Sequence, residues 1–181
     1  MQEALWPAVL ILGYVTLQRL GELVIARANT RRLLAQGGIE VGAPHYPLIV
    51  ALHAAWLVTL WLLAPGRPAM VVPLVLFALV QVLRFWTLAS IGRRWTTRIV
   101  VVPGETLVAR GPYRFIRHPN YTVVVLEIAL LPLVFGLGWV ALLFSILNAL
   151  ALAIRIPAEA KALAEHAHRV QPSAGAARRS A

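Results

Sequence analysis

Side chains able to do chemistry gather in one short segment, residues 111–121, with the sequence Gly-Pro-Tyr-Arg-Phe-Ile-Arg-His-Pro-Asn-Tyr. Pro119 disfavours the helical conformation for His118, so we expect an extended turn just before an apolar run. The backbone groups of residues 117–120 then need water, protein or a polar ligand as partners. The two tyrosines of the segment, Tyr113 and Tyr121, would add aromatic walls and hydroxyls suited to an adenine or a ribose. The alternative is an aromatic belt at a membrane interface with snorkelling arginines.

A second candidate pair, Arg155 and Glu159, follows the last apolar run. The two residues are four apart and share one helical face. A guanidinium there can grip a carboxylate or another oxyanion with two hydrogen bonds. The glutamate could accept hydrogen bonds from a ribose or an ammonium group. The alternative is an ordinary salt bridge on a solvated helix.

Several ionisable residues interrupt the apolar runs, where burial in lipid is costly and function or pairing must explain them. They are Arg19, Glu22, His53, Arg84, Glu127 and Arg155, with Gln81 and Asn148 as neutral companions. The three-residue spacing of Arg19 and Glu22 favours a structural pair on one helix. Glu127 needs a partner, for which Arg84 or Asn148 could serve. Whether Glu127 is structural or lines a substrate site is left open by the spacing alone.

The composition indicates an integral membrane protein. Of the 181 residues 60% are hydrophobic and 13% charged, and the net charge is +10. Soluble domains carry about 25% charged residues, and a chain this short cannot hide so much apolar surface in one core. The arginines lie between long apolar runs, a pattern that follows the positive-inside rule and argues against nucleic-acid binding.

The residue types exclude some chemistry. The chain has no cysteine, so disulfides, thiolate catalysis and Cys-bound zinc are excluded. It has no aspartate, and His166 and His168 are two apart, a spacing that does not face one way on a helix. We therefore predict no metal site.

The apolar runs predict an all-α integral membrane protein of about five transmembrane helices, with a cytoplasmic cofactor-binding loop and a short C-terminal helix. The expected spans are residues 5–26, 46–64 and 69–91, followed by a hairpin within 121–154 that turns at Gly136 and Gly138. A basic loop is expected at Arg27, Arg31 and Arg32, and a separate helix at about 155–167. Residues 1–168 would form one domain, with the cofactor part at about 92–165, and residues 169–181 a disordered basic tail.

Charge sets the expected orientation. A hairpin places the basic segment 92–120 and the basic tail on one side of the membrane, which the positive-inside rule makes cytoplasmic. The N-terminus would then lie outside, in what is most simply a bacterial inner membrane. This topology brings His118 and Tyr113 to the same side as Arg155 and Glu159.

Over about residues 80–165 the chain resembles the isoprenylcysteine carboxyl methyltransferase family. The resemblance rests on four features in this order: Gly-Pro-Tyr-Arg, Arg-His-Pro-Asn-Tyr, the helical hairpin and Arg-x-x-x-Glu. The resemblance implies a membrane enzyme that uses S-adenosylmethionine without a Rossmann fold, and an Arg155 that orients the acceptor group. It further implies cofactor contacts from Arg98, Glu105, Thr106, Leu107, Val108, Tyr113, His118, Pro119, Asn120, Tyr121 and Glu159. Segments 18–22 and 45–47 resemble a bacterial branch associated with O-methylation of long-chain phenolic or pyrone lipids.

The expected function is therefore O-methylation of a lipophilic acceptor in the membrane, either an isoprenylcysteine-type carboxylate or a long-chain phenol or pyrone. A carboxylate is already ionised at neutral pH, whereas a phenol would need a base, for which Glu127 or His118 are candidates. Expected partners are the acceptor and membrane lipids, and the oligomeric state is left open. Alternatives are a phospholipid N-methyltransferase, an NADPH-dependent membrane reductase, and a small transporter or assembly subunit.

Overall fold

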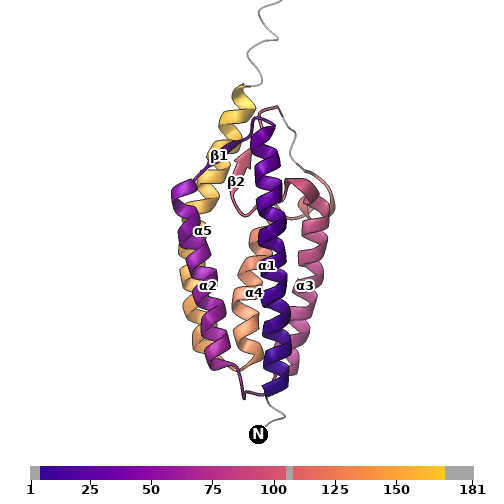
Figure 1. Cartoon of the computed structure of the whole chain (residues 1–181), viewed down its shortest axis with the longest axis vertical. Helices are drawn as coiled ribbons and strands as arrows, with labels where there is room; N and C mark the ends of the chain where they lie inside the picture. Colours follow the sequence, from indigo (N-terminus) through magenta and orange to yellow (C-terminus); the bar gives the residue numbers. More distant parts are fainter. Residues whose placement is uncertain (1–4, 105–107, 170–181) are drawn as a thin grey trace, which may run out of the picture.

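Five helices form an elongated bundle in the computed structural model, which describes residues 5–104 and 108–169 (Figure 1). The helices are α1 (Leu5–Ala35), α2 (Tyr46–Leu63), α3 (Val71–Ile91), α4 (Pro119–Val134) and α5 (Gly138–Arg169). Three short 3-10 turns, η2 (Ala43–His45), η3 (Gly92–Arg94) and η4 (Gly111–Arg114), lie in the connections. Apart from Arg169, the expected basic tail lies outside the described residues.

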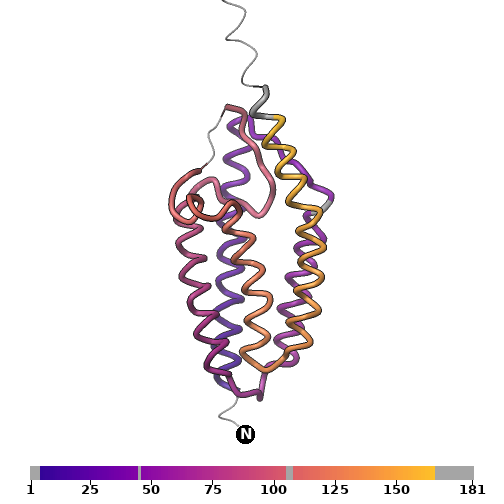
Figure 2. The backbone as a smooth tube through the Cα atoms, turned by 180° about the vertical axis from the view of Figure 1, so that it is seen from behind, coloured from indigo at the N-terminus to yellow at the C-terminus, as the bar shows by residue number. Residues whose placement is uncertain are grey.

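Four of these helices, α1, α2, α3 and α5, are long and apolar enough to cross a membrane. Helix α4 is apolar but has 16 residues, which at ~1.5 Å per residue is about 24 Å and less than the ~30 Å of a bilayer core. The all-α membrane fold expected from the sequence is confirmed. The short α4 begins below the ends of its longer neighbours α1 and α5, as Figure 2 shows from behind.

The expected hairpin forms between α4 and α5. Gly136 has φ +66°, the left-handed region that favours glycine, and its N–H donates to the Leu133 carbonyl oxygen. Gly138 is the first residue of α5. The hairpin therefore turns at Gly136 and Gly138, as the sequence predicted.

Two boundaries differ from the expectation. Helix α1 continues through Arg27, Arg31 and Arg32 to Ala35, so the basic loop expected there is wrong. Arginine, leucine and alanine are good helix formers, and the chain meets no helix breaker before Gly37. Likewise, the expected separate C-terminal helix is the last part of α5, which runs unbroken past Pro157.

A small antiparallel sheet, absent from the sequence prediction, closes one end of the bundle. Strand β1 (Ile39–Val41) pairs with β2 (Ile99–Val101), with Glu40 opposite Val100. Ile99 and Val101 pack on Ala162 of α5. A Cβ at Gly38 would lie 2.7 Å from the Leu33 carbonyl oxygen, so only glycine fits this turn. The sheet joins the segment after α1 to the segment after α3, and its end of the bundle is called the strand end below.

Candidate active site

A cavity of about 310 Å³ lies inside the bundle. All five helices and the segment 95–97 contribute to its walls. Nine of its 23 lining residues are aliphatic, including Leu23, Ile49, Leu57, Val124 and Leu152. Of the residues assigned to the acceptor or the cofactor, Asn120, Tyr121 and Arg155 line it. Five of the polar residues that interrupt the apolar runs also line it: Arg19, Glu22, His53, Arg84 and Asn148.

Tyr121 joins Arg155 to Glu159 at the strand end of this cavity. The Tyr121 hydroxyl donates to Glu159 Oε2 at 2.5 Å and accepts from Arg155 Nε at 3.0 Å. Arg155 Nη2 also donates to the Thr97 carbonyl oxygen at 2.6 Å. Arg155 and Glu159 thus do not form the ordinary salt bridge that their spacing allows. We call Arg155, Tyr121 and Glu159 the tyrosine-bridged pair.

The turn before α4 lies where the sequence predicted it, with His118 outside the helical region but, at ψ 67°, short of the extended region. The φ of His118 is −132°, and Pro119 is the first residue of α4. The His118 ring lies 5.5 Å from the Tyr121 ring, centroid to centroid. Asn120 Oδ1 accepts a hydrogen bond of 3.5 Å from the Trp95 indole. The His118 ring therefore lies beside Tyr121, and Tyr121 links this turn to Glu159.

Tyr113 lies close to Glu159 in the same region. Burial and the nearby carboxylate raise the pKa of Tyr113 from 10.0 to about 12. Its hydroxyl therefore stays protonated at neutral pH and can donate a hydrogen bond. The adjacent turn packs tightly, because Gly111 has φ +58° and a Cβ there would overlap the Ser90 side chain.

Arg98, expected at the cofactor, contacts Glu40 and Tyr46 in this structure. Its Nη1 lies 2.9 Å from each carboxylate oxygen of Glu40, and its guanidinium lies 4.7 Å above the Tyr46 ring. Glu40 raises the pKa of this exposed arginine. Arg98 thus ties the two strands together and makes no contact with the tyrosine-bridged pair. Of the other residues expected at the cofactor, Val108 is half-buried in a loop, and Glu105, Thr106 and Leu107 lie outside the described residues.

A second group of charges lies deeper in the bundle: Arg19, Glu22, Gln81, Arg84 and Glu127, here called the central ion-pair cluster. Arg84 donates to Glu22 through Nε at 2.5 Å and through Nη2, and to Glu127 Oε2 at 2.6 Å. Arg19 contacts both carboxylates, at 3.3 Å to Glu22 and 2.5 Å to Glu127. Gln81 donates to the other Glu127 oxygen at 2.7 Å. Both carboxylates are fully engaged, and the two charges of each sign balance.

Sequence reasoning missed the residues that support the tyrosine-bridged pair from the segment before β2. Thr97 accepts from Arg155 through its backbone, and its side chain lies 3.1 Å from the Tyr46 hydroxyl. The Trp95 carbonyl oxygen accepts from buried Asn29 of α1 at 2.8 Å. A backbone carbonyl carries no sequence signal, so Thr97 could not have been identified by residue type.

The corner around Glu159 suits a nucleoside. Glu159 Oε1 has no hydrogen bond to any residue that the structure describes, so it can accept from ribose hydroxyls or an ammonium group. Three aromatic rings, those of Tyr113, His118 and Tyr121, offer faces for a base, and the Asn120 amide offers a donor. These residues fit the methyl donor that the sequence motif implies.

Two comparisons place the chain among known proteins. The Isoprenylcysteine carboxyl methyltransferase (ICMT) family matches residues 71–165, slightly more than half of the chain, from the start of α3 into α5. A protein of Bacillus subtilis (strain 168), named Uncharacterized protein YpbQ, is 42% identical over 163 residues, which covers 87% of this chain and 96% of that protein. No solved structure matches the chain.

Proposed function

The chain belongs to the isoprenylcysteine carboxyl methyltransferase family and is a membrane methyltransferase, and we propose that it transfers a methyl group from S-adenosylmethionine to an oxygen of a lipophilic acceptor. The observation that carries this proposal is the tyrosine-bridged pair at the end of an apolar cavity. Arg155 lines the cavity, whereas Glu159, on the other side of the Tyr121 hydroxyl, is not among the lining residues. Glu159 can therefore serve the methyl donor and Arg155 the methyl acceptor.

Glu159, Tyr113, His118, Asn120 and Tyr121 would hold the methyl donor, together with the backbone at Pro119. The donor supplies an electrophilic methyl on a sulfonium. The protein needs to bind and orient it, because the reaction requires alignment more than acid–base chemistry. The half-buried Tyr113 hydroxyl and the free Glu159 oxygen are the polar anchors of this half of the site.

The cavity would hold the acceptor. Leu20 of α1 and Val50 of α2 both line it, and they are 55% and 41% exposed. We infer that the cavity opens toward the lipid between α1 and α2, the two helices between which α4 is seen at the back in Figure 1. A lipid such as an isoprenylcysteine-type carboxylate, a long-chain phenol or a pyrone could enter sideways. The exclusion of water by these walls would favour methyl transfer.

Arg155 would hold the acceptor oxygen. Its Nη1 has no hydrogen bond to a described residue, so it can donate to an oxyanion while Nε and Nη2 fix the guanidinium plane. Glu127 is a poor candidate for a base, since both of its oxygens already accept hydrogen bonds in the central ion-pair cluster. We assign Glu127 a structural role.

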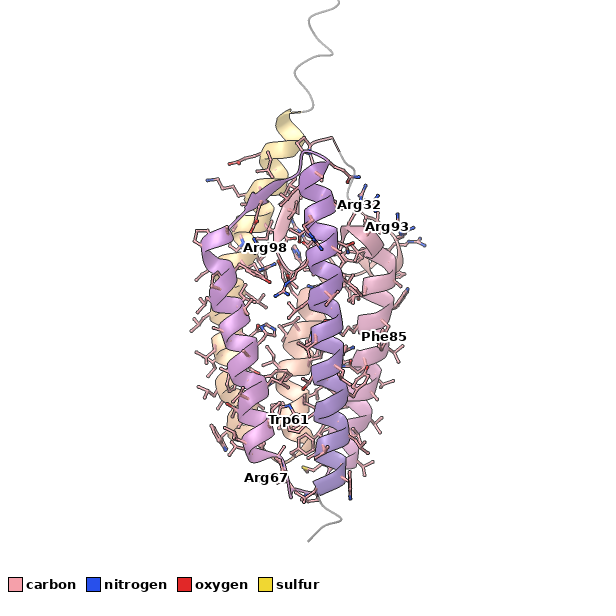
Figure 3. The ribbon with its side chains drawn as sticks, in the orientation of Figure 1. Arg32, Trp61, Arg67, Phe85, Arg93 and Arg98 are labelled. Carbon is pink, nitrogen blue, oxygen red and sulfur yellow. The ribbon has the colours of Figure 1, made fainter. Side chains whose placement is uncertain are left out.

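The strand end would face the cytoplasm. Figure 3 shows Arg32, Arg93 and Arg98 near this end and Arg67 at the other. The positive-inside rule then places the donor site in the cytoplasm, where S-adenosylmethionine is made, and the N-terminus outside. A bacterial inner membrane is the location that fits this orientation.

Calorimetry with S-adenosylhomocysteine tests the proposal directly. The purified chain in detergent should bind this product with a Kd in the micromolar range, about −8 kcal/mol. Labelled S-adenosylmethionine should then transfer its methyl group to a lipid in an extract. Binding of NADPH without binding of S-adenosylhomocysteine would overturn the proposal.

A further inference from the structure

Three polar side chains in the middle of the acceptor cavity have no role in the site described so far. They are His53 and Trp56 of α2 and Asn148 of α5, and all three line the cavity. His53 and Trp56 are three residues apart and share one helical face. Helices α2 and α5 pack together, so this face of α2 meets the wall that carries Asn148.

The hydrogen bond of His53 defines what its ring offers to a ligand. Nδ1 lies 2.8 Å from the Ile49 carbonyl oxygen. A carbonyl can only accept, so Nδ1 carries the proton and Nε2 of the neutral ring is an acceptor. Nε2 has no hydrogen bond to any residue in the described part of the chain. The cavity therefore contains a fixed hydrogen-bond acceptor with no protein partner.

The Asn148 amide supplies a donor in the same cavity. The Asn148 side chain is 3% exposed and has no hydrogen bond within the described ranges. The Trp56 indole N–H and the Arg19 Nε–H are also buried without an acceptor among those residues. Buried polar groups without partners are costly, and native proteins hold few of them. The two of these groups that a ligand in the cavity could complete are His53 Nε2 and the Asn148 amide.

We propose that His53 and Asn148 form a second acceptor subsite, which binds a free hydroxyl on the head of the lipid, distinct from the oxygen that is methylated. A hydroxyl donates one hydrogen bond and accepts two, so it can donate to His53 Nε2 and accept from the Asn148 amide. A carbonyl or a methyl ether cannot donate to His53. This inference rests on the proposed function, because it assumes that the cavity holds the acceptor.

The depth of the subsite indicates how far apart the two oxygens lie. Tyr46 contacts Thr97 at the level of Arg155. His53 is seven residues further along α2, and its ring leans back toward Ile49, which places it about 5–10 Å deeper. One aromatic ring with a hydroxyl on each side spans a distance of this order. The cavity has about twice the ~150 Å³ that encloses a benzene molecule, enough for such a ring and a few methylene groups.

The subsite makes the first half of the chain responsible for acceptor choice. His53 lies on α2, outside the residues 71–165 that match the family. The donor half of the site lies inside that range. A dihydroxylated head group, rather than a single carboxylate, is therefore the acceptor class that this cavity selects.

A matched pair of lipids tests the inference: a pentadecyl resorcinol and the pentadecyl phenol that lacks one ring hydroxyl. Quenching of tryptophan fluorescence, with S-adenosylhomocysteine bound, measures the affinity for each lipid, since Trp56 and Trp95 line the cavity. The resorcinol should bind about 100-fold more tightly, because the phenol leaves His53 and Asn148 without a partner. The ratio of kcat/KM should follow the same order.

Two substitutions assign the preference to the subsite. His53→Asn keeps a donor for the Ile49 carbonyl and removes only Nε2, and Asn148→Leu keeps the shape and removes the amide. Each should reduce the preference to within about 10-fold by weakening resorcinol binding, with little change for the phenol. Trp61→Phe is the matched control, since its indole N–H already donates to Thr16 and should leave the preference unchanged.

The outcomes separate the two proposals. If S-adenosylhomocysteine does not bind, the proposed function fails. If it binds but the two lipids bind equally well, or neither binds, the subsite is wrong and the methyltransferase assignment stands. A preference that survives both His53→Asn and Asn148→Leu also overturns the subsite.

Discussion

The central ion-pair cluster and the tyrosine-bridged pair use the same residue types to different ends. In the cluster, Arg84 contacts Glu22 and Glu127 directly, and every carboxylate oxygen has a donor. In the pair, a tyrosine hydroxyl stands between Arg155 and Glu159, and one oxygen of Glu159 has no donor among the described residues. Direct pairing neutralises charge and links helices, whereas the bridged arrangement keeps each charge available for a ligand.

The largest expected effect comes from the cluster. Arg84→Met leaves two carboxylates without their main partner at a site where Arg84 is 2% exposed. Removing one member of a buried ion pair costs about 3–5 kcal/mol. The variant should lose most of its folded population in detergent, measured by thermal unfolding.

A compensating variant checks the cause of that loss. Arg84→Met combined with Glu22→Gln and Glu127→Gln removes the unmatched charges and should recover part of the melting temperature. No recovery would mean that Arg84 acts through its packing rather than through its charge.

The next effect is on turnover and leaves the fold intact. Arg155→Ala removes the proposed donor to the acceptor oxygen, and we expect a loss of kcat/KM of about 100- to 1,000-fold. S-adenosylhomocysteine affinity, measured by calorimetry, should change by less than about 10-fold, since Arg155 faces the cavity. An equal loss of both quantities would contradict the division of labour between Arg155 and Glu159.

Glu159→Gln should act on the donor instead. Loss of the charge-assisted hydrogen bonds predicts a rise of about 10- to 100-fold in the Kd of S-adenosylhomocysteine. Glu165→Gln is the matched control on the same helix, because Glu165 is exposed and pairs only weakly, at 3.9 Å, with exposed Lys161. If both variants bind equally well, Glu159 does not hold the donor.

The smallest effect concerns Tyr113 and appears only at high pH. Because the fold raises the pKa of Tyr113 from 10.0 to about 12, the protonated phenol stabilises the folded state below pH 10. That stabilisation should be lost as pH rises from 10 to 12. Between pH 10 and 12 the melting temperature of the wild type should therefore fall relative to that of Tyr113→Phe. If the two plots of melting temperature against pH are parallel, the fold does not raise the pKa of Tyr113.

Local signals in the sequence predicted much of the site. Pro119 marked the start of α4 and a non-helical His118, and two glycines marked the hairpin, because these residues restrict or widen the range of backbone conformations. The four-residue spacing placed Arg155 and Glu159 on one face. The spacing could not reveal that Tyr121 stands between them, since that contact joins α5 to a different helix.

Long-range contacts account for what was missed. Arg84 was a candidate partner for Glu127, but its equal contact with Glu22, 62 residues away, depends on how α1 and α3 pack. The sheet pairs Glu40 with Val100, although helices α2 and α3 separate them in the sequence. Strands of three residues are too short to show the alternation of apolar and polar residues that predicts a strand. Arg98, assigned to the cofactor by resemblance, pairs with Glu40 across the sheet, a contact that the sequence did not indicate, and its role at the cofactor stays a prediction.

The central ion-pair cluster also has a consequence for a chain whose helices enter the membrane one after another. Helix α1 enters the membrane with Arg19 and Glu22 already matched on one face. Helix α3 then adds the positive charge of Arg84, and only α4, with Glu127, restores electrical balance. A nascent chain that has not yet inserted α4 carries an uncompensated cation in lipid. Insertion of α4, the helix that carries Tyr121 of the active site, is thus also the step that balances the charges at the centre of the bundle.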